Sequence, residues 1–537
     1  MLPLWYELLA RPESDHKVRS AGAIAEAHRR GMPGLDKAIP KLVAELDRPE
    51  VPAAVRVALV HALATLDAKG AADAMFRAGR DGDIDVRQIV DPCLTRWQYE
   101  PVRAAWLERI QVKPSQRGTV LAIRGLLAAK DVRAIPRLRE IALAADEPAP
   151  VRLEAAAALA ELKPTGLEAE ARTLGAVAGQ RGVVGRVVAA TLLRRHDGAA
   201  AIELLQSFAT DPEPTVASRA MARLIEWDPK HVAPVLDAAL ANPDAAVRLP
   251  AVDALHRNPT DANLRKLGDR LADVHPDVRT KARLAMLDLY GKTEHQAAIR
   301  REGLRILNGP YWGGLQQASL LLGAIDHKPA APRLLELQRH ERNEVFVSAA
   351  WALRKLDLPD TAAPVLAIFN DRLRFYKTKI NTVPPLVGQG FDEQLSQLAQ
   401  LLGQRKHAPA SAPFRTLIPL NSGPTETRAA AIWALGRIHD GQKNIGFESL
   451  LEGRLNAVSP FDLEPPIIRR MSAVTLGRVN AVATVASLRT HYSGRPVRDD
   501  VSNACGWALE RITGEKMPAA GIEEERQVGF FALPIGK

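Results

Sequence analysis

The chain has 537 residues, more than one hydrophobic core normally holds, so it must contain several domains or an array of repeats. Lysine and arginine exceed aspartate and glutamate by 72 − 62 = 10 charges, a balance that favours acidic partners or polyanions and does not bear on the fold. Apolar residues make up 47% of the chain but aromatic residues only 5%, so alanine, leucine and valine must supply the packing, and a strand-rich class is excluded.

We expect neither an export signal nor a membrane span in this sequence. Its first ten residues, MLPLWYELLA, contain Glu7 and no basic residue, unlike a signal peptide, and no run of eighteen apolar residues follows. Cys93 and Cys505 are 505 − 93 = 412 positions apart, so we interpret both as small core residues. We expect a cytoplasmic monomer, although a start inside a repeat helix is also compatible with a piece of a larger protein.

One sequence pattern occurs three times between residues 211 and 304. Val216, Val247 and Val278 are spaced by 247 − 216 = 31 and 278 − 247 = 31 residues. Apolar residues recur four and eight positions after each valine, which marks one face of a helix rather than a strand. A helix pair that returns every thirty-odd residues is typical of a solenoid. The later register residues are Ala220, Ala251 and Ala282, then Leu224, Leu255 and Met286.

The same pattern can be followed along the chain in order. A first pair of helices is expected at residues 2–9 and 17–28. Further second helices are expected at 55–66, from 86, at 116–129 and 151–162, from 184, 216, 247 and 278, at 316–325 and 345–356, and from 469 and 501. We therefore predict an all-α solenoid of roughly 14 stacked antiparallel helix pairs.

The regularity divides the chain into four predicted parts. Residues 1–307 hold regular repeats, and residues 308–428 hold less regular ones that start at the Gly-rich stretch 308–314. The Pro-, Ser- and Ala-rich segment 404–427 is expected to be an exposed insertion. Residues 429–514 return to the repeat with a second insertion at 456–466. Residues 515–537 form an acidic, then apolar, tail.

Three Trp-Ala-Leu tripeptides connect the second half of the chain to the same register. They begin at Trp351, Trp433 and Trp507, separated by 433 − 351 = 82 and 507 − 433 = 74 residues, close to two repeats each. An exposed row of tryptophans could bind a partner, but tryptophan in an Ala-Leu helix more often fills packing volume. We favour the packing interpretation.

The pattern Asp-Pro-x-x-x-Val-Arg-x-x-Ala-x-x-Ala-Leu, seen best at residues 151–159 and 247–255, resembles the HEAT repeat, and in particular the bacterial HEAT-like repeats of phycobilisome lyases. The resemblance covers essentially the whole chain. It implies paired helices stacked into a superhelix whose second helices line the concave side. For function it implies a scaffold or adaptor, or less commonly a nucleic-acid binder or a lyase subunit.

An arginine follows the repeat valine in many copies. Its helical position lies about 60° from the centre of the apolar face, on the flank toward the neighbouring repeat. We therefore predict an inter-repeat structural ladder, in which each arginine pairs with an aspartate or a helix C-terminus next door. A stripe of anion-binding arginines is the alternative. The ladder residues are Arg19, Arg56, Arg87, Arg152, Arg248 and Arg279.

A compact basic patch lies within residues 371–379, where four cations have two aromatic residues between them. Such a mixture can hold phosphate and stack on bases, although a solvated helix face with two core aromatics has the same composition. The candidate binding residues are Arg372, Arg374, Phe375, Tyr376, Lys377 and Lys379.

The sequence lacks the common catalytic and metal-binding motifs: the metalloprotease His-Glu-x-x-His, a complete phosphate loop, the Gly-x-Ser-x-Gly elbow and Cys-x-x-Cys. We accordingly predict no catalytic residue, metal or cofactor. The leading hypothesis is a non-enzymatic scaffold that holds a protein partner. The alternatives are binding of nucleic acid or another polyanion, and a lyase-like HEAT subunit.

Overall fold

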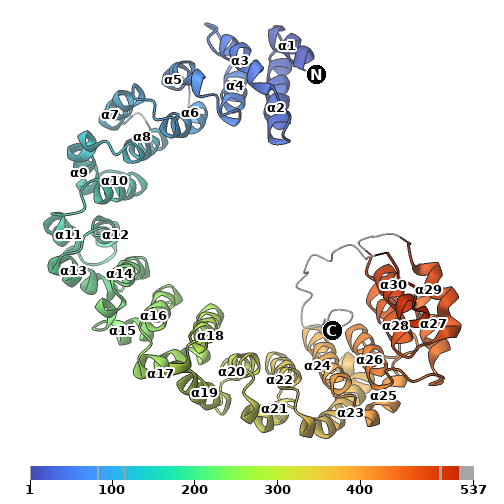
Figure 1. Cartoon of the computed structure of the whole chain (residues 1–537). Helices are drawn as coiled ribbons and strands as arrows, with labels where there is room; N and C mark the ends of the chain where they lie inside the picture. Colours follow the sequence, from blue (N-terminus) through green and yellow to red (C-terminus); the bar gives the residue numbers. More distant parts are fainter. Residues whose placement is uncertain (1, 82–83, 114, 495–498, 519–537) are drawn as a thin grey trace. The chain divides into compact units, whose positions relative to one another are not determined.

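The computed structural model describes residues 2–81, 84–113, 115–494 and 499–518 (Figure 1). Over these residues thirty α-helices follow one another as 30 / 2 = 15 antiparallel pairs, and in most pairs the two helices pack on each other. The prediction of an all-α solenoid is confirmed, with one pair more than estimated. No helix within the described ranges is long and apolar enough to cross a membrane.

The first helices of the pairs are α1 (Leu2–Ala10), α3 (Ile39–Leu46), α5 (Ala72–Asp81), α7 (Val102–Val112), α9 (Ile135–Leu143), α11 (Glu168–Gly175), α13 (Ala199–Ala209), α15 (Leu236–Ala241), α17 (Asp261–Asp269), α19 (Thr293–Leu307), α21 (Ala331–Leu337), α23 (Ala362–Lys379), α25 (Ser411–Arg415), α27 (Glu448–Leu455) and α29 (Val485–His491). The second helices are α2 (Ser14–Arg29), α4 (Ala53–Thr65), α6 (Ile84–Arg96), α8 (Gln116–Ala128), α10 (Ala149–Leu162), α12 (Val183–Leu192), α14 (Pro214–Trp227), α16 (Ala245–Arg257), α18 (Pro276–Tyr290), α20 (Trp312–Ala324), α22 (Asn343–Leu356), α24 (Pro385–Gln404), α26 (Thr425–Ile438), α28 (Pro466–Arg478) and α30 (Asp500–Thr513).

The chain forms two compact units that meet within α16, between Ala251 and Val252. In each unit the second helices form one layer and the first helices the other, and in the first unit the second helices lie on the concave side (Figure 1). Successive second helices pack on one another, from α2 to α14 in the first unit and from α18 to α30 in the second. The four-part division by regularity stays a prediction.

Short 3₁₀ helices join many repeats. They are η1 (Leu35–Ala38), η2 (Lys69–Ala71), η3 (Val132–Ala134), η4 (Gln180–Gly182), η5 (Pro229–Val232), η6 (Arg270–Ala272), η7 (Lys328–Ala330), η8 (Pro359–Thr361), η9 (Ile380–Thr382), η10 (Ala408–Ala410) and η11 (Val482–Thr484). Several of them follow a residue with positive φ that ends a second helix, such as Asp67, Lys130, Asp326 or Asn480. A left-handed residue at this position satisfies the last carbonyls and turns the chain into the next pair.

Small residues let the second helices of the second unit approach closely. A Cβ on Gly403 would lie 2.7 Å from Cβ of Ala434 and 2.8 Å from the ring of Trp433. The same relation repeats two pairs before and two pairs after, so each of the three tryptophans covers a glycine of the preceding second helix. The packing interpretation of these tryptophans is therefore correct. The other two glycines and their tryptophans are Gly323 with Trp351 and Gly477 with Trp507.

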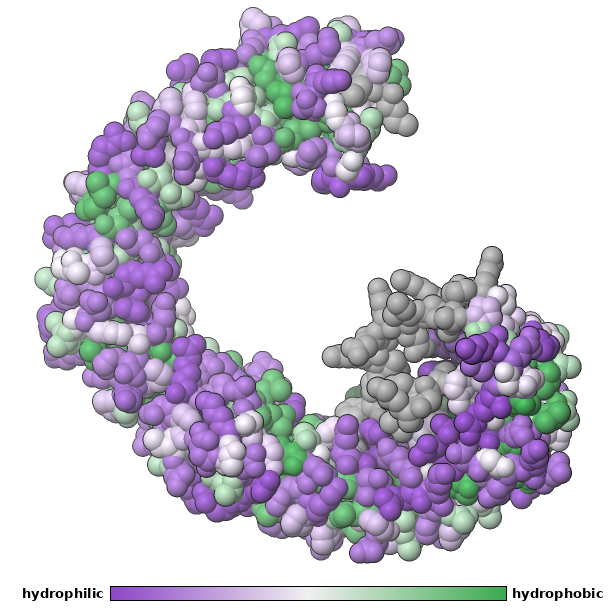
Figure 2. Space-filling view, in the orientation of Figure 1, coloured by the Kyte–Doolittle hydropathy of each residue, from purple (hydrophilic) through white to green (hydrophobic). Residues whose placement is uncertain are grey.

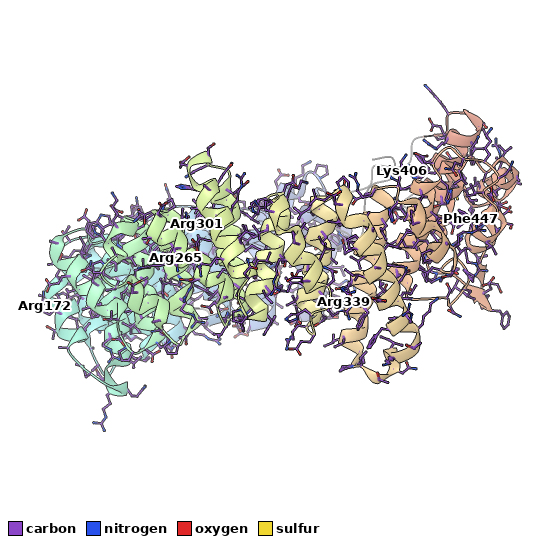
Figure 3. The ribbon with its side chains drawn as sticks, turned by 90° about the horizontal axis from the view of Figure 1, so that it is seen from below. Arg172, Arg265, Arg301, Arg339, Lys406 and Phe447 are labelled. Atoms are coloured by element: carbon purple, nitrogen blue, oxygen red, sulfur yellow. The ribbon has the colours of Figure 1, made fainter. Side chains whose placement is uncertain are left out.

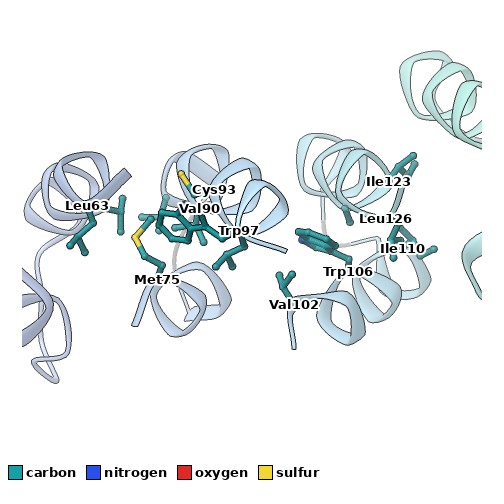
Figure 4. Close-up of a cluster of buried hydrophobic side chains, with 14 of the residues drawn as sticks. Leu63, Met75, Val90, Cys93, Trp97, Val102, Trp106, Ile110, Ile123 and Leu126 are labelled. Carbon is teal, nitrogen blue, oxygen red and sulfur yellow. The ribbon is translucent and has the colours of Figure 1, made fainter. Parts of the chain in front are cut away.

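The core of the first unit combines aliphatic and sulfur side chains with two tryptophans (Figure 4). Trp97 and Trp106 fill the space between helices, and Cys93 is buried beside them. Cys505, in α30, is completely buried, and burial raises the pKa of its thiol to about 12. Both free thiols are thus core residues, as expected.

The prediction of an exposed insertion at residues 404–427 is wrong. This segment contains η10 and α25, the first helix of a regular pair, and Phe414, Leu417 and Ile418 are fully buried. Phe414 meets Phe369 edge to face at 5.1 Å. The Pro, Ser and Ala composition suggested a loop, but proline is well suited to the first turns of a short helix, where no backbone donor is needed.

Residues 456–466 contain an antiparallel hairpin between α27 and α28. Its strands are β1 (Val458–Ser459) and β2 (Asp462–Leu463), with Val458 opposite Leu463 and Ser459 opposite Asp462. None of the apolar side chains on the two strands is buried. The hairpin therefore lies outside the packed helix layers of its unit.

Candidate functional site

The predicted arginine ladder takes a different form from the one expected. Arg152 donates from Nε to the Ala142 carbonyl at 3.2 Å, and Arg279 donates from Nη1 to the Asp273 carbonyl at 2.9 Å. These carbonyls lie at the end of the helix just before, in the arginine's own pair. A guanidinium there satisfies free carbonyls at the negative end of a helix dipole. Arg56, Arg87 and Arg248 likewise bond to carbonyls five to eight residues before them.

For Arg56, Arg152 and Arg279 these carbonyl partners lie just before the arginine in its own repeat, whereas the prediction placed the partner in the neighbouring repeat. Arg19 does not take part, because its side chain is exposed on α2. Lys17 is the cation that occupies the equivalent buried position, and it pairs with buried Glu45. The first repeat has no register valine, so the Val-Arg motif at residues 18–19 placed the register two positions too late.

Three further arginines have the same role, and two of them also connect consecutive repeats. Arg186 bonds to the Val177 and Gly179 carbonyls and pairs with Asp211 at 2.6 Å. Arg428 bonds to the Leu417 and Ile418 carbonyls and pairs with Glu464, while Arg469 bonds to the Leu455 carbonyl. Sequence reasoning missed them because the preceding residue is Gly, Thr or Ile instead of Val.

The predicted patch at residues 372–379 forms the end of α23, and the structure divides it. Arg372 donates to the Gln338 carbonyl and lies over the rings of Phe346, at 5.4 Å, and Phe391, at 5.3 Å. Burial lowers the pKa of Arg372. Phe375 stacks on Phe391 with 5.1 Å between ring centroids. One cation and one aromatic ring of the patch are thus used in packing α23 against its neighbours.

The other cations of the patch are open to solvent. Arg374, Lys377 and Lys379 are exposed, and Arg374 has one weak ion pair, 3.9 Å from Asp371. Tyr376 is half-buried, and burial, followed by the charge of Asp392, raises the pKa of its phenol. Since Phe375 already stacks within the fold, the patch offers exposed charge rather than the interleaved aromatic rings that base stacking needs.

The register break at residues 308–314 is a local packing feature. Trp312, the first residue of α20, lies between two guanidinium groups, 5.0 Å from that of Arg279 and 4.4 Å from that of Arg342. The next residue is Gly313, where a side chain would not fit, because a Cβ there would lie 2.9 Å from Arg279 Nε. This stretch therefore joins two repeats.

The 458–463 hairpin carries Phe461, the most exposed large apolar side chain in the described part of its unit. Phe461 is 98% exposed at the turn, and Val458 and Leu463 are exposed on the strands. The strand that returns to α28 is anchored, because buried Glu464 accepts hydrogen bonds from Arg428 and Arg454. By contrast, the face of the chain in Figure 2 is mostly hydrophilic, with small and separate hydrophobic groups.

Titratable groups in the described ranges do not form a metal site: no group of three or more His, Cys, Asp or Glu side chains could hold an ion there. Half-buried Asp392 caps α26 from α24, accepting hydrogen bonds from the Thr427 amide and hydroxyl, both at 2.7 Å, and from the Glu426 amide. Burial raises the pKa of Asp392 and that of Glu426, whose carboxyl the charges of Asp392 and Glu393 also affect.

Comparison with known proteins identifies a fold and no family. No family model and no curated protein matches the chain. Solved structures do match: Kap121p bound to Pho4p with a TM-score of 0.57 and 12% identity, and Kap95p in complex with RanGDP with 0.54 and 12%. The alignments cover 95% of this chain, but only 56% of Kap121p and 77% of Kap95p. These α-solenoids confirm the HEAT-like fold, whereas the bacterial phycobilisome-lyase subclass stays a prediction.

Proposed function

We propose that the chain is a non-catalytic scaffold that binds a protein partner, and that the 458–463 hairpin is part of its contact surface. The exposure of Phe461 carries this proposal. A fully exposed phenylalanine between two exposed aliphatic residues leaves apolar area in water, and such patches on folded proteins usually become buried in a complex. Aromatic side chains are also the residues that most often dominate binding energy.

The anchoring of the hairpin supports the same proposal. Because Glu464 is held by two arginines at the base, the strands are positioned before any partner arrives, and less conformational entropy is lost on binding. Stacked repeats supply the extended surface that surrounds such a contact. Related architectures are known in complexes, since Kap121p has been solved bound to Pho4p and bound to Ste12p.

The test is a quantitative cross-linking capture with the tagged full chain in its native lysate. Phe461→Asp should reduce the recovery of a stoichiometric protein partner, because it places a charge in an apolar contact. Leu386→Asp is the matched control, since Leu386 is also apolar and largely exposed, at 73%, but lies on α24. Equal recovery by the wild type and Phe461→Asp would remove the hairpin from the contact, and absence of any stoichiometric partner would refute the scaffold.

A second candidate function is binding of nucleic acid or another polyanion, favoured by the exposed cations Arg374, Lys377 and Lys379 and by the excess of ten positive charges. Affinity should then fall steeply with salt, because neutralised phosphates release counterions. Changing the three cations to glutamine should reduce the slope of this dependence in a mobility-shift titration. An unchanged slope would exclude α23 as the polyanion site.

A further inference from the structure

One carboxylate in the second unit is surrounded by an excess of cations. Asp440 follows α26, and three cations contact it from the carboxyl ends of α24, α28 and α30. A fourth cation, in the last turn of α26, lies close enough for its charge to act on one of these three. The four cations form, with Asp440, what we call the Asp440 cluster. The cations are Lys406 after α24, Arg437 in α26, Arg478 at the end of α28 and Arg511 in α30.

The distances show three of these cations sharing a single acid. Arg511 Nη2 lies 2.8 Å from Asp440 Oδ1, while Lys406 Nζ and Arg478 Nη1 lie 3.6 Å and 3.9 Å from Oδ2. The cluster therefore has a formal charge of 4 − 1 = +3. A helix C-terminus stabilises one nearby cation, but this effect does not account for the convergence of cations from three repeats on one carboxylate.

Two tryptophans hold the guanidinium groups in place. Arg478 and Arg511 both lie over the ring of Trp507, at 5.6 Å each, and Arg437 lies over Trp433 at 5.8 Å. Stacking on an aromatic face fixes the plane of a guanidinium while its N–H groups still point outward in that plane. The arginines are thus positioned for hydrogen bonding without a ligand having to order them.

The buried part of the cluster is short of negative charge. The Arg478 side chain is 7% exposed, and burial, then the nearby charges of Arg437 and Arg511, lower its pKa. The Nε atoms of Arg437 and Arg478 are buried without a hydrogen-bond partner in the described part of the chain. A buried charge without full compensation is costly, so an added anion would stabilise this arrangement.

The outer part of the cluster is accessible. The side chains of Lys406 and Arg511 are 52% and 43% exposed, and Figure 3 shows where Lys406 lies, on the same part of the unit as Phe447. An anion could therefore reach the cluster from solvent and displace part of the weak contacts with Asp440. Two or three carboxylates in succession would balance its charge.

We propose that the Asp440 cluster binds the carboxylate side chains of an acidic peptide segment. This proposal deepens the proposed function, on which it rests, by assigning the chemistry of part of the partner. Arginine suits such a ligand because its planar fork donates two parallel hydrogen bonds to one carboxylate. Lys406, at the exposed edge, adds a flexible charge that can follow the next acidic residue.

The test is fluorescence anisotropy of a labelled hexaglutamate peptide with the full chain at low salt. The double variant Lys406→Gln and Arg511→Gln should weaken binding about tenfold, the loss typical of one or two charge-assisted contacts. The matched control changes Arg374 and Lys377 to glutamine, which removes the same charge from α23, and it should bind within about twofold of the wild type. Circular dichroism verifies that both variants are folded.

Asp440→Asn supplies an independent measurement with the opposite sign. It removes the internal competitor and should tighten hexaglutamate binding. Equal weakening by the two double variants, or an absence of binding to the folded wild type, would overturn the site. Stronger competition by a single-stranded oligonucleotide or by inorganic phosphate than by unlabelled hexaglutamate would overturn the assignment to acidic peptide.

The outcome is separable from that of the scaffold proposal, because the anisotropy assay needs no cellular partner. Loss of partner capture with normal hexaglutamate binding would refute only the scaffold. Normal, hairpin-dependent capture without hexaglutamate binding would refute only the Asp440 site.

Discussion

Arg428 and Glu464 form an ion pair with 2.6 Å between Nη2 and Oε1, although they are 36 residues apart and belong to consecutive repeats. Both side chains are almost completely buried. Arg428 also donates to two carbonyls at the end of the preceding segment, and Glu464 also accepts from Arg454. The pair therefore joins the capping of one helix pair to the base of the hairpin in the next.

Glu464→Gln should destabilise the second unit strongly, because two arginines would lose their shared counter-charge in a buried site. Removing one partner of such a pair typically costs about 3–5 kcal/mol. Thermal unfolding followed by circular dichroism measures the effect. Glu515→Gln breaks an exposed pair with Arg489 and should leave the midpoint nearly unchanged. Equal shifts for both variants would mean that burial of the Arg428–Glu464 pair contributes nothing.

Gly403→Ala should destabilise the packing of α24 on α26. The new Cβ would lie 2.7 Å from Cβ of Ala434, and overpacking of this kind costs about 1–3 kcal/mol. Gly453→Ala is the control, since its Cβ would meet nothing within 4 Å and alanine favours the helix by about 0.5–1 kcal/mol. Urea denaturation should therefore move the two midpoints in opposite directions. A Gly403→Ala variant as stable as the wild type would contradict the close approach.

Asp392 should make stability depend on pH. Burial raises the pKa of its carboxyl in the folded state, so the folded chain binds more protons than the unfolded chain between the two pKa values. The free energy of unfolding then falls as pH rises from the ordinary range of an exposed carboxyl, near pH 4, through the folded pKa. The direction is the same for Glu426, which lies beside it.

Asp392→Asn should remove this contribution while keeping an acceptor for the Thr427 amide. We therefore expect the melting temperature of the variant minus that of the wild type to increase between pH 4 and pH 8. A difference that is constant over this range, or that changes in the opposite direction, would show that the hydrogen bonds from Thr427 and Glu426 outweigh desolvation of the carboxylate.

The fold could be predicted because it depends on a local pattern that repeats. The spacing of Val216, Val247 and Val278 fixes helix faces, and each face packs only on neighbouring repeats.

The ladder prediction was partly wrong because helical phase gives the direction of a side chain, not how far back along the chain an arginine reaches. At Arg19 the register itself was misplaced, since no valine marks the first repeat.

The Asp440 cluster could not be predicted for a different reason. Its members extend from Lys406 to Arg511, over 511 − 406 = 105 positions, and no short motif connects them. A recurring position could have indicated the cluster, because Arg437, Arg478 and Arg511 all occur in the last turns of second helices. Only stacking of those helices brings the side chains together, and it depends on glycines such as Gly477 that admit Trp507.

Arg152→Met tests whether the arginine ladder acts within a repeat. The variant keeps an unbranched apolar stem in the buried site but removes the donor to the Ala142 carbonyl, which should cost about 1–3 kcal/mol. Hydrogen exchange with mass spectrometry should show faster exchange in the last turn of α9, which ends at Leu143, and unchanged exchange in α11. Arg124→Met is the control, because Arg124 forms an exposed pair with Glu154 in the next repeat and caps no helix. Equal loss of protection in α9 and α11 would restore the inter-repeat ladder that the sequence alone suggested.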